Sequence, residues 1–167
     1  MISFLGFFSL IVFAISVGAL LLHFKVIKRR SAADDCLEIL DSLLRDRLEI
    51  LCEIAELSPN PYELQELCEI HAAQDTRKII KSLPRLHKMA AFILDGFEEP
   101  DESEEPEESE EMEIIKVFDV NLLEIRQAIQ NYNGELTAYN DMIAVFPGNV
   151  MANILGLTPE KEIGPGV

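Results

Sequence analysis

The chain has no tryptophan, only three cysteines and few basic residues. The small numbers of cysteines and of basic residues each argue against a class of protein. Three cysteines cannot form the disulfide framework of a small secreted domain. The 14 Lys and Arg residues face 30 Asp and Glu residues, which gives a net charge of −16. A nucleic-acid-binding protein needs a basic surface to neutralise phosphates, so this composition argues against that class. A length of 167 residues suits one domain of ordinary size.

Sequence motifs for catalysis are also missing. The chain has no glycine pattern for binding nucleotides, no GxSxG, no CxxC and no HExxH. Cys68 and His71 lie one helical turn apart, but a zinc site needs three or four ligands. We therefore expect no catalytic residue, no metal site and no cofactor. A metal-dependent enzyme with a carboxylate site between helices is the alternative, because helical bundles are able to house such sites.

A long uncharged segment occupies the N-terminal end of the chain. Ile2–Phe24 contains no Asp, Glu, Lys or Arg, and as a helix it would extend about 34 Å. That length crosses the hydrocarbon core of a bilayer, so residues 1–24 are predicted to be a transmembrane anchor. The alternative is a cleaved signal peptide, which has positive charge before a shorter apolar run. Here the positive charge follows the run, as Lys25, Lys28, Arg29 and Arg30.

The same basic residues predict the orientation of the anchor. They lie in a basic flank, residues 25–31, and Lys- and Arg-rich flanks stay in the cytoplasm. We therefore expect a single-pass protein of the cell (inner) membrane. Its N-terminus would lie outside and its C-terminal part would be cytoplasmic.

Residues 32–97 carry apolar side chains at helical spacing. The spacing predicts one helix over 32–57, which is free to run on from the membrane segment because nothing between Lys25 and Asp35 breaks it. The two prolines in 58–61 end it. A second helix is predicted over 62–82. The Ser82-Leu83-Pro84 stretch that follows allows either a kink or a fresh start with Ser82 as the N-cap.

An acidic repeat follows at residues 98–113. It holds 11 acidic residues and no basic one, so without it the net charge would be −16 + 11 = −5. Like charges at this density repel, and Pro100 and Pro106 oppose a helix, so a disordered linker is predicted. A calcium loop is the alternative, but the EF-hand spacing of ligands around a central glycine is missing.

The most regular pattern lies in residues 114–157. From Phe118 to Phe146, apolar residues alternate spacings of four and three over more than three heptads, as in a coiled coil. The pattern predicts one helix over 114–146 that continues through Gly134. Asn149 would cap a short helical turn over 150–155 that ends at Gly156, and residues 158–167 would be a frayed tail. Amphipathic helices bury their apolar faces against one another. The predicted fold is therefore all-α, a single N-terminal transmembrane helix followed by an antiparallel helical bundle.

The last helix also carries a repeated motif, R-x5-YN-x5-YN-x5-FP-x-N-x2-A-x3-G, between Arg126 and Leu157. This pattern resembles the C-terminal signature of the LemA family, small bacterial membrane proteins with one N-terminal span and a cytoplasmic helical bundle. Family members usually have an Arg-rich stretch running into Asp-Leu, with a proline, in the first cytoplasmic helix. The corresponding segment here, residues 45–49, has no proline. The Tyr-Pro-x-Leu stretch that usually precedes the last helix is absent, and the acidic repeat stands in that place. The resemblance implies a divergent member and assigns no catalytic residue.

The residues of this signature have a physical interpretation of their own. They are Tyr132, Asn133, Tyr139, Asn140, Phe146 and Pro147. The tyrosine rings would fill layers of the core, and the asparagine side chains would bond a neighbouring helix and fix its register. The alternative is a polar patch that binds a ligand or another protein.

Together, the sequence predicts a membrane-anchored, non-catalytic interaction or scaffold protein. Its expected partners are the lipid bilayer and either another protein or a second copy of itself. Neither a nucleic acid nor a small-molecule substrate is indicated.

Overall fold

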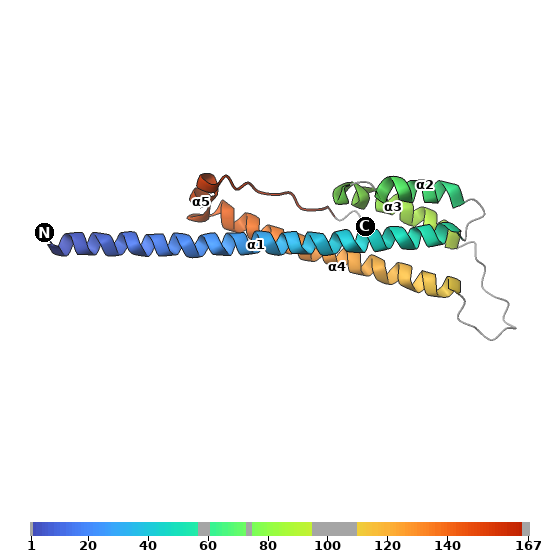
Figure 1. The fold of residues 1–167 in the computed structure, drawn as a ribbon, viewed down its shortest axis with the longest axis horizontal. Coiled ribbons are helices and arrows are strands. Elements are labelled where there is room, and N and C mark those ends of the chain that lie inside the picture. The colour runs from blue at the N-terminus through green and yellow to red at the C-terminus, as the bar shows by residue number, and fades with distance from the viewer. Residues whose placement is uncertain (1, 57–60, 73–74, 95–109, 165–167) are drawn as a thin grey trace. The chain divides into compact units, whose positions relative to one another are not determined.

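The computed structural model describes residues 2–56, 61–72, 75–94 and 110–164. This part of the chain forms helices and contains no β-strand, so the predicted all-α fold class is confirmed. The helices are α1 Ile2–Glu56, α2 Pro61–Ala72, α3 Thr76–Leu94, α4 Glu110–Ala144 and α5 Gly148–Leu155 (Figure 1).

Helix α1 joins the predicted membrane segment to the first bundle helix without a break. No proline or glycine lies between Lys25 and Glu56, so nothing in that stretch interrupts its backbone hydrogen bonds. Its N-terminal part is long and apolar enough to cross a membrane, and 6% of the most apolar stretch is buried. A core helix of a soluble protein would be mostly buried, and this stretch is not.

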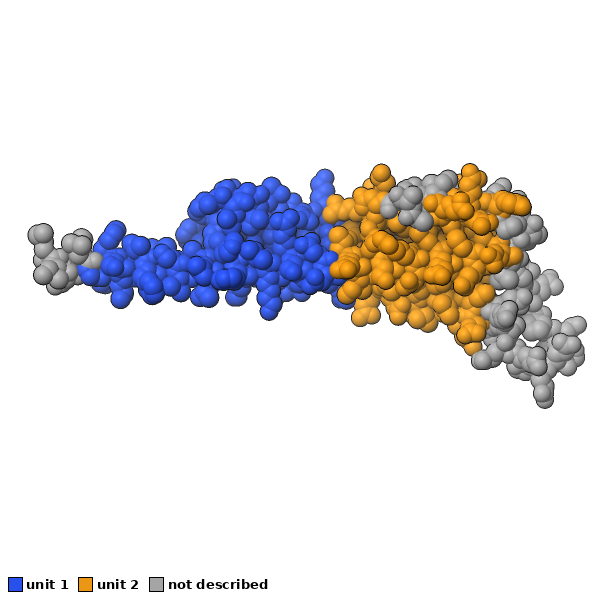
Figure 2. Space-filling view, in the orientation of Figure 1, with its two compact units in different colours: residues 1–36, 131–162 blue, residues 37–130, 163–167 orange. Residues whose placement is uncertain are grey.

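The chain forms two compact units, which Figure 2 shows in different colours. Unit 1 contains residues 1–36 and 131–162, and unit 2 contains residues 37–130 and 163–167. Helices α1 and α4 contribute to both units.

Unit 2 is a bundle of four helical segments around a leucine- and isoleucine-rich core. The leucine stripe that the sequence predicts on α1 is buried at Leu40, Leu44 and Leu51. The buried residues from the other helices are Leu64 and Cys68 of α2, Ile79, Ile80, Leu83, Leu86 and Ala90 of α3, and Phe118, Ile125, Ala128 and Ile129 of α4. Helices α2 and α3 pack against each other.

Two hydrogen bonds show that α1 and α4 run antiparallel in unit 2. The Nδ2 atom of Asn121 on α4 donates to the carbonyl oxygen of Leu43 on α1 at 3.3 Å. The Arg47 guanidinium, one turn further along α1, donates to the carbonyl oxygen of Phe118, which lies earlier on α4. The contacts advance along one helix and go back along the other, as in the predicted antiparallel bundle.

The predicted helix over 62–82 is wrong, because the structure has two helices there. Helix α2 ends at Ala72 and α3 begins at Thr76. Asp75 starts the new helix: its carbonyl accepts the Lys78 amide at 2.8 Å, and its carboxylate accepts the Arg77 amide at 3.3 Å. Ser82 is therefore not an N-cap. It lies inside α3 and donates its hydroxyl to the Ile79 carbonyl at 2.8 Å, and Pro84 is also inside α3.

Helix α4 differs from the prediction at both ends. It begins at Glu110, so residues 110–113 are helical and not part of the predicted linker. Residues 98–109 of the acidic repeat lie outside the described residues. The helix continues through Gly134, as predicted, but it ends at Ala144. At the start of the apolar pattern Asn121 is buried and Leu122 is half-buried, because position 121 faces α1.

In unit 1, the second half of α4 packs against α5 and against the stretch of α1 that follows the uncharged segment. Its buried residues are Tyr132, Leu136, Tyr139 and Ile143 on α4, Val26 and Ala33 on α1, and Gly148 and Ala152 on α5. Helix α5 ends at Gly156, whose φ of 67° gives the left-handed conformation that was predicted for a C-cap. Asn149 is not the N-cap, because α5 begins at Gly148, two residues earlier than predicted, and Pro147 occupies the N-cap position.

Candidate functional site

The signature residues on α4 hold the C-terminal segment in place. The Asn140 side chain donates to the carbonyl of Glu160 at 2.9 Å and accepts its amide at 3.0 Å. The Tyr139 hydroxyl donates to the Thr158 carbonyl at 3.3 Å, and Thr137 donates to the Glu162 carboxylate at 2.8 Å. The prediction of a frayed tail is therefore wrong for residues 158–164, and Ile163 there is buried.

These contacts also correct the predicted role of Asn140. Its amide bonds an extended segment and not a neighbouring helix, because α4 presents it to the returning chain. Tyr132 and Tyr139 do fill the core, at 2% and 1% exposure. Burial raises the pKa of Tyr139, so its hydroxyl stays a hydrogen-bond donor. Asn133 is half-buried and has interactions of its own.

The turn between α4 and α5 carries the remaining signature residues. Phe146 was predicted to continue the apolar pattern of α4, but it lies beyond the end of the helix with 77% of its surface exposed. Pro147 caps α5. Gly148 is buried, and a Cβ atom there would lie 1.8 Å from the carbonyl oxygen of Met142. Only glycine allows this approach of α5 to the end of α4.

The basic flank lies on α1 in unit 1, where Lys25, Lys28, Arg29 and Arg30 are all exposed. Arg29 pairs with Glu135 of α4 at 2.7 Å, and Arg30 pairs with Glu160 at 3.7 Å. Lys25 and Lys28 line a shallow hollow together with Leu21, Leu22 and Pro147. The α4–α5 turn therefore lies beside the position on α1 where the uncharged segment ends.

A second cluster, in unit 2, centres on Arg47. This arginine is 1% exposed. Its guanidinium carbon lies 3.4 Å from the centroid of the Phe118 ring, and the group donates to the Phe118 carbonyl. It also donates to Nδ1 of His87 at 3.0 Å. Because an arginine only donates, His87 accepts at Nδ1 and carries its own proton on Nε2.

The surroundings of Arg47 and His87 shift both groups toward their neutral forms. Burial lowers the pKa of Arg47 to about 10, and the charge of Asp119 partly opposes that change. Arg47 is thus still a cation at neutral pH. Burial lowers the pKa of His87, and the positive charges of Arg47 and Arg126 lower it further. The His87 ring, stacked on Phe118 at 5.1 Å, is therefore neutral at pH 7.

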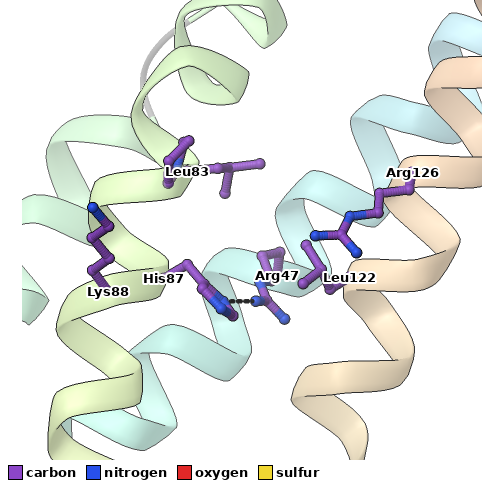
Figure 3. A pocket seen from close by; sticks show the side chains of 7 residues that line it. Arg47, Leu83, His87, Lys88, Leu122 and Arg126 are labelled. Carbon is purple, nitrogen blue, oxygen red and sulfur yellow. Dashed lines mark hydrogen bonds between the residues drawn. The ribbon is translucent and has the colours of Figure 1, made fainter. Parts of the chain in front are cut away.

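A cavity of about 150 Å³ adjoins this cluster. Figure 3 shows the bond between Arg47 and His87 at its wall, with Arg126 extending from α4 toward Arg47. The lining residues are Arg47, Leu83, Pro84, His87, Lys88, Leu122 and Arg126. An arrangement of this kind is able to bind a small anion, since its walls are apolar and its polar groups are hydrogen-bond donors at neutral pH.

The cysteines show no arrangement for catalysis or metal binding. Cys36, Cys52 and Cys68 are free thiols. Burial raises the pKa of Cys68 to about 12, and a hydrogen bond with Cys52 adds to the effect. A metal needs the thiolate form, so this environment disfavours the Cys68–His71 pair as ligands. Within the ranges that the structure describes, no three His, Cys, Asp or Glu side chains form a group that could hold a metal ion.

Arg47 and Asn121, the two buried polar residues of the described chain, were not predicted from the sequence. Their positions contained a signal. Arg47 lies three residues after Leu44 and four before Leu51, on the buried stripe of α1. Asn121 lies in the same way between Phe118 and Ile125 on α4. A polar residue at such a position is buried with its polar groups: Asn121 donates its Nδ2 to the Leu43 carbonyl, whereas its Oδ1 has no partner among the described residues.

Comparison of the whole chain with protein-family models, curated proteins and solved structures found no match.

Proposed function

We propose that this chain is a membrane-anchored, non-catalytic interaction or scaffold protein whose helical bundle lies on the cytoplasmic side. The uncharged part of α1 supplies the anchor, and the same helix continues into the bundle. The resemblance to the LemA family, which stays a prediction, supports the same arrangement.

The basic flank supports the proposed orientation. Lys25, Lys28, Arg29 and Arg30 are exposed on α1 directly after the uncharged segment. Anionic lipid headgroups attract such a group of charges, and Lys- and Arg-rich flanks are retained on the cytoplasmic side. The ion pairs of Arg29 and Arg30 leave Lys25 and Lys28 available to lipid phosphates.

The observation that carries the proposal is a second apolar surface beside the end of the anchor. No charged residue occurs from 142 to 159. The exposed apolar residues in this stretch are Val145, Phe146, Val150, Ile154 and Leu155. Pro147 shares a hollow with Leu21 and Lys25, at the position where α1 passes from apolar to basic. This surface therefore lies at the depth of the lipid headgroups and holds unit 1 against the bilayer.

Tryptophan fluorescence tests this arrangement, because the chain has no tryptophan of its own. Phe13→Trp places a probe in the uncharged segment, and Phe146→Trp places one in the α4–α5 turn. The exposed Asn131 lies on α4 about 20 Å before the end of that helix, so Asn131→Trp is a matched control. The full chain is reconstituted in vesicles that contain brominated lipids, which quench only nearby tryptophans.

We expect quenching at positions 13 and 146 and none at 131. If the Phe13→Trp probe is not quenched, α1 does not lie in the bilayer and the proposed function is wrong. If Phe13→Trp is quenched but Phe146→Trp behaves like the Asn131→Trp control, the anchor is correct and the second lipid contact is wrong.

Crosslinking in the native membrane tests the interaction role. A second protein recovered reproducibly with the chain, or a ladder of its own multiples, supports a scaffold or a self-assembling protein. Recovery of the monomer alone contradicts this role.

A further inference from the structure

The cavity in unit 2 has a charge opposite to that of the rest of the chain. Acidic residues outnumber basic ones by 30 to 14 overall. The described residues that line the cavity include three cationic side chains and one histidine, and none of them is acidic. Low-dielectric walls such as Leu83, Pro84 and Leu122 strengthen the field of these charges inside the cavity.

Arg47 has no negatively charged hydrogen-bond partner among the described residues. Its guanidinium has five N–H donors, and its described acceptors, the Phe118 carbonyl and His87 Nδ1, are both neutral. No carboxylate among the described residues forms an ion pair with it, and Asp119 acts only through its longer-range charge. A buried cation without an opposite charge is costly, so an anion in the adjoining cavity would stabilise the site.

We propose that this cavity binds a small organic oxyanion, a carboxylate or phosphate monoester that carries a short apolar group. Arg47, Lys88 and Arg126 contact the anionic oxygens, and Leu83, Pro84 and Leu122 contact the apolar group. An arginine fork matches the geometry of carboxylate and phosphate oxygens.

The size of the cavity sets the size of the ligand. Its volume of about 150 Å³ resembles that of an engineered protein cavity that holds one benzene molecule. A bare inorganic anion would leave the apolar walls uncovered, whereas an anionic group on one small ring would contact both kinds of wall. Benzoate, phenyl phosphate and inorganic phosphate are therefore the probes, with benzamide as the neutral match for benzoate.

The histidine ring signals in NMR report directly on the site. The chain has three histidines, of which His87 lines the cavity while His23 and His71 do not. The full chain is labelled at histidine, placed in lipid nanodiscs and titrated with each probe at constant pH and ionic strength. We expect benzoate or phenyl phosphate to shift the His87 signals saturably and His71 to stay unchanged. His23, at the end of the uncharged segment, reports any partition of a probe into lipid.

Charge-removing variants distinguish specific binding in the cavity from non-specific attraction of anions to the protein surface. Lys88→Gln and Arg126→Gln each remove a lining cation from an exposed position. We expect each to weaken benzoate binding about tenfold, the loss of one charge-assisted contact. Arg85→Gln removes an exposed cation from the same helix outside the lining, and it should change binding less than about twofold.

The titrations and variants give results that either support the anion site or overturn it. The site is supported if benzoate binds saturably and more tightly than benzamide. Lys88→Gln and Arg126→Gln should weaken that binding, and Arg85→Gln should not. Tighter binding of phenyl phosphate than of benzoate assigns it to phosphate monoesters, and the reverse order assigns it to carboxylates. The proposal is overturned if neither organic anion shifts the His87 signals, or if benzamide shifts them equally. It is also overturned if inorganic phosphate binds more strongly than the organic anions, or if Arg85→Gln weakens binding as much as Lys88→Gln does.

Discussion

Asn140 offers a sharp test of how the C-terminal segment is held. Asn140→Ala removes both hydrogen bonds between the Asn140 side chain and the Glu160 backbone. The backbone amide and carbonyl of Glu160 then lose these partners. Each neutral hydrogen bond contributes about 0.5–1.5 kcal/mol, so local opening of the segment should become about 1–3 kcal/mol easier. That change corresponds to roughly a 5- to 150-fold larger open population.

Hydrogen exchange at the Glu160 amide measures this opening directly, because the Asn140 side chain protects that amide in the folded chain. The exposed Asn131→Ala on the same helix is the matched control, since both changes alter helix propensity equally. Exchange at Glu160 should accelerate in Asn140→Ala alone. Equal exchange rates in the two variants would refute the assigned role of Asn140.

Three further variants test other parts of the structure. Gly134→Ala should stabilise the chain by about 1 kcal/mol, because alanine favours a helix over glycine and no atom lies within 4 Å of the added Cβ. An unchanged or lower melting temperature would contradict this. Gly148→Ala should destabilise it by at least about 2 kcal/mol, because its Cβ would meet the Met142 carbonyl; a wild-type urea midpoint would disprove the close approach. Burial lowers the pKa of His87 below 6.5. As the pH falls, the His87 ring therefore binds a proton in the unfolded chain before it does so in the folded chain. The contribution of His87 to stability is complete above about pH 6.5 and is lost as the pH falls toward the folded pKa. Urea midpoints at about pH 7.5 and about pH 5.5 should therefore differ more in wild type than in His87→Asn, whereas an equal difference in both would show that another group causes the pH dependence.

The helical content could be predicted because each helix carries its own periodic signal. The leucine stripe on α1 and the pattern from Phe118 to Ile143 on α4 are local features, and both are buried largely as predicted. Helix boundaries were less predictable where competing signals were close. Pro84 suggested a break, but the cap formed by Asp75 starts α3 earlier, and the proline is accommodated inside the helix.

The candidate sites depended on contacts between distant segments, which periodicity does not encode. Asn140 was recognised as an unusual residue, but its partner is a segment that looked like an unstructured tail. The burial of Arg47 could not be predicted, since a single arginine does not disturb a leucine stripe in a sequence. Its burial depends on the Phe118 carbonyl and His87, which come from α4 and α3.

Protease digestion of intact cells tests the central claim, that the uncharged N-terminal helix is retained and holds the rest of the chain on the cytoplasmic side. With a C-terminal tag, we expect full-length protein that resists protease in intact cells and is digested in inverted membrane vesicles. Digestion of the tagged part in intact cells, or a mature chain that begins after Arg30, would contradict it.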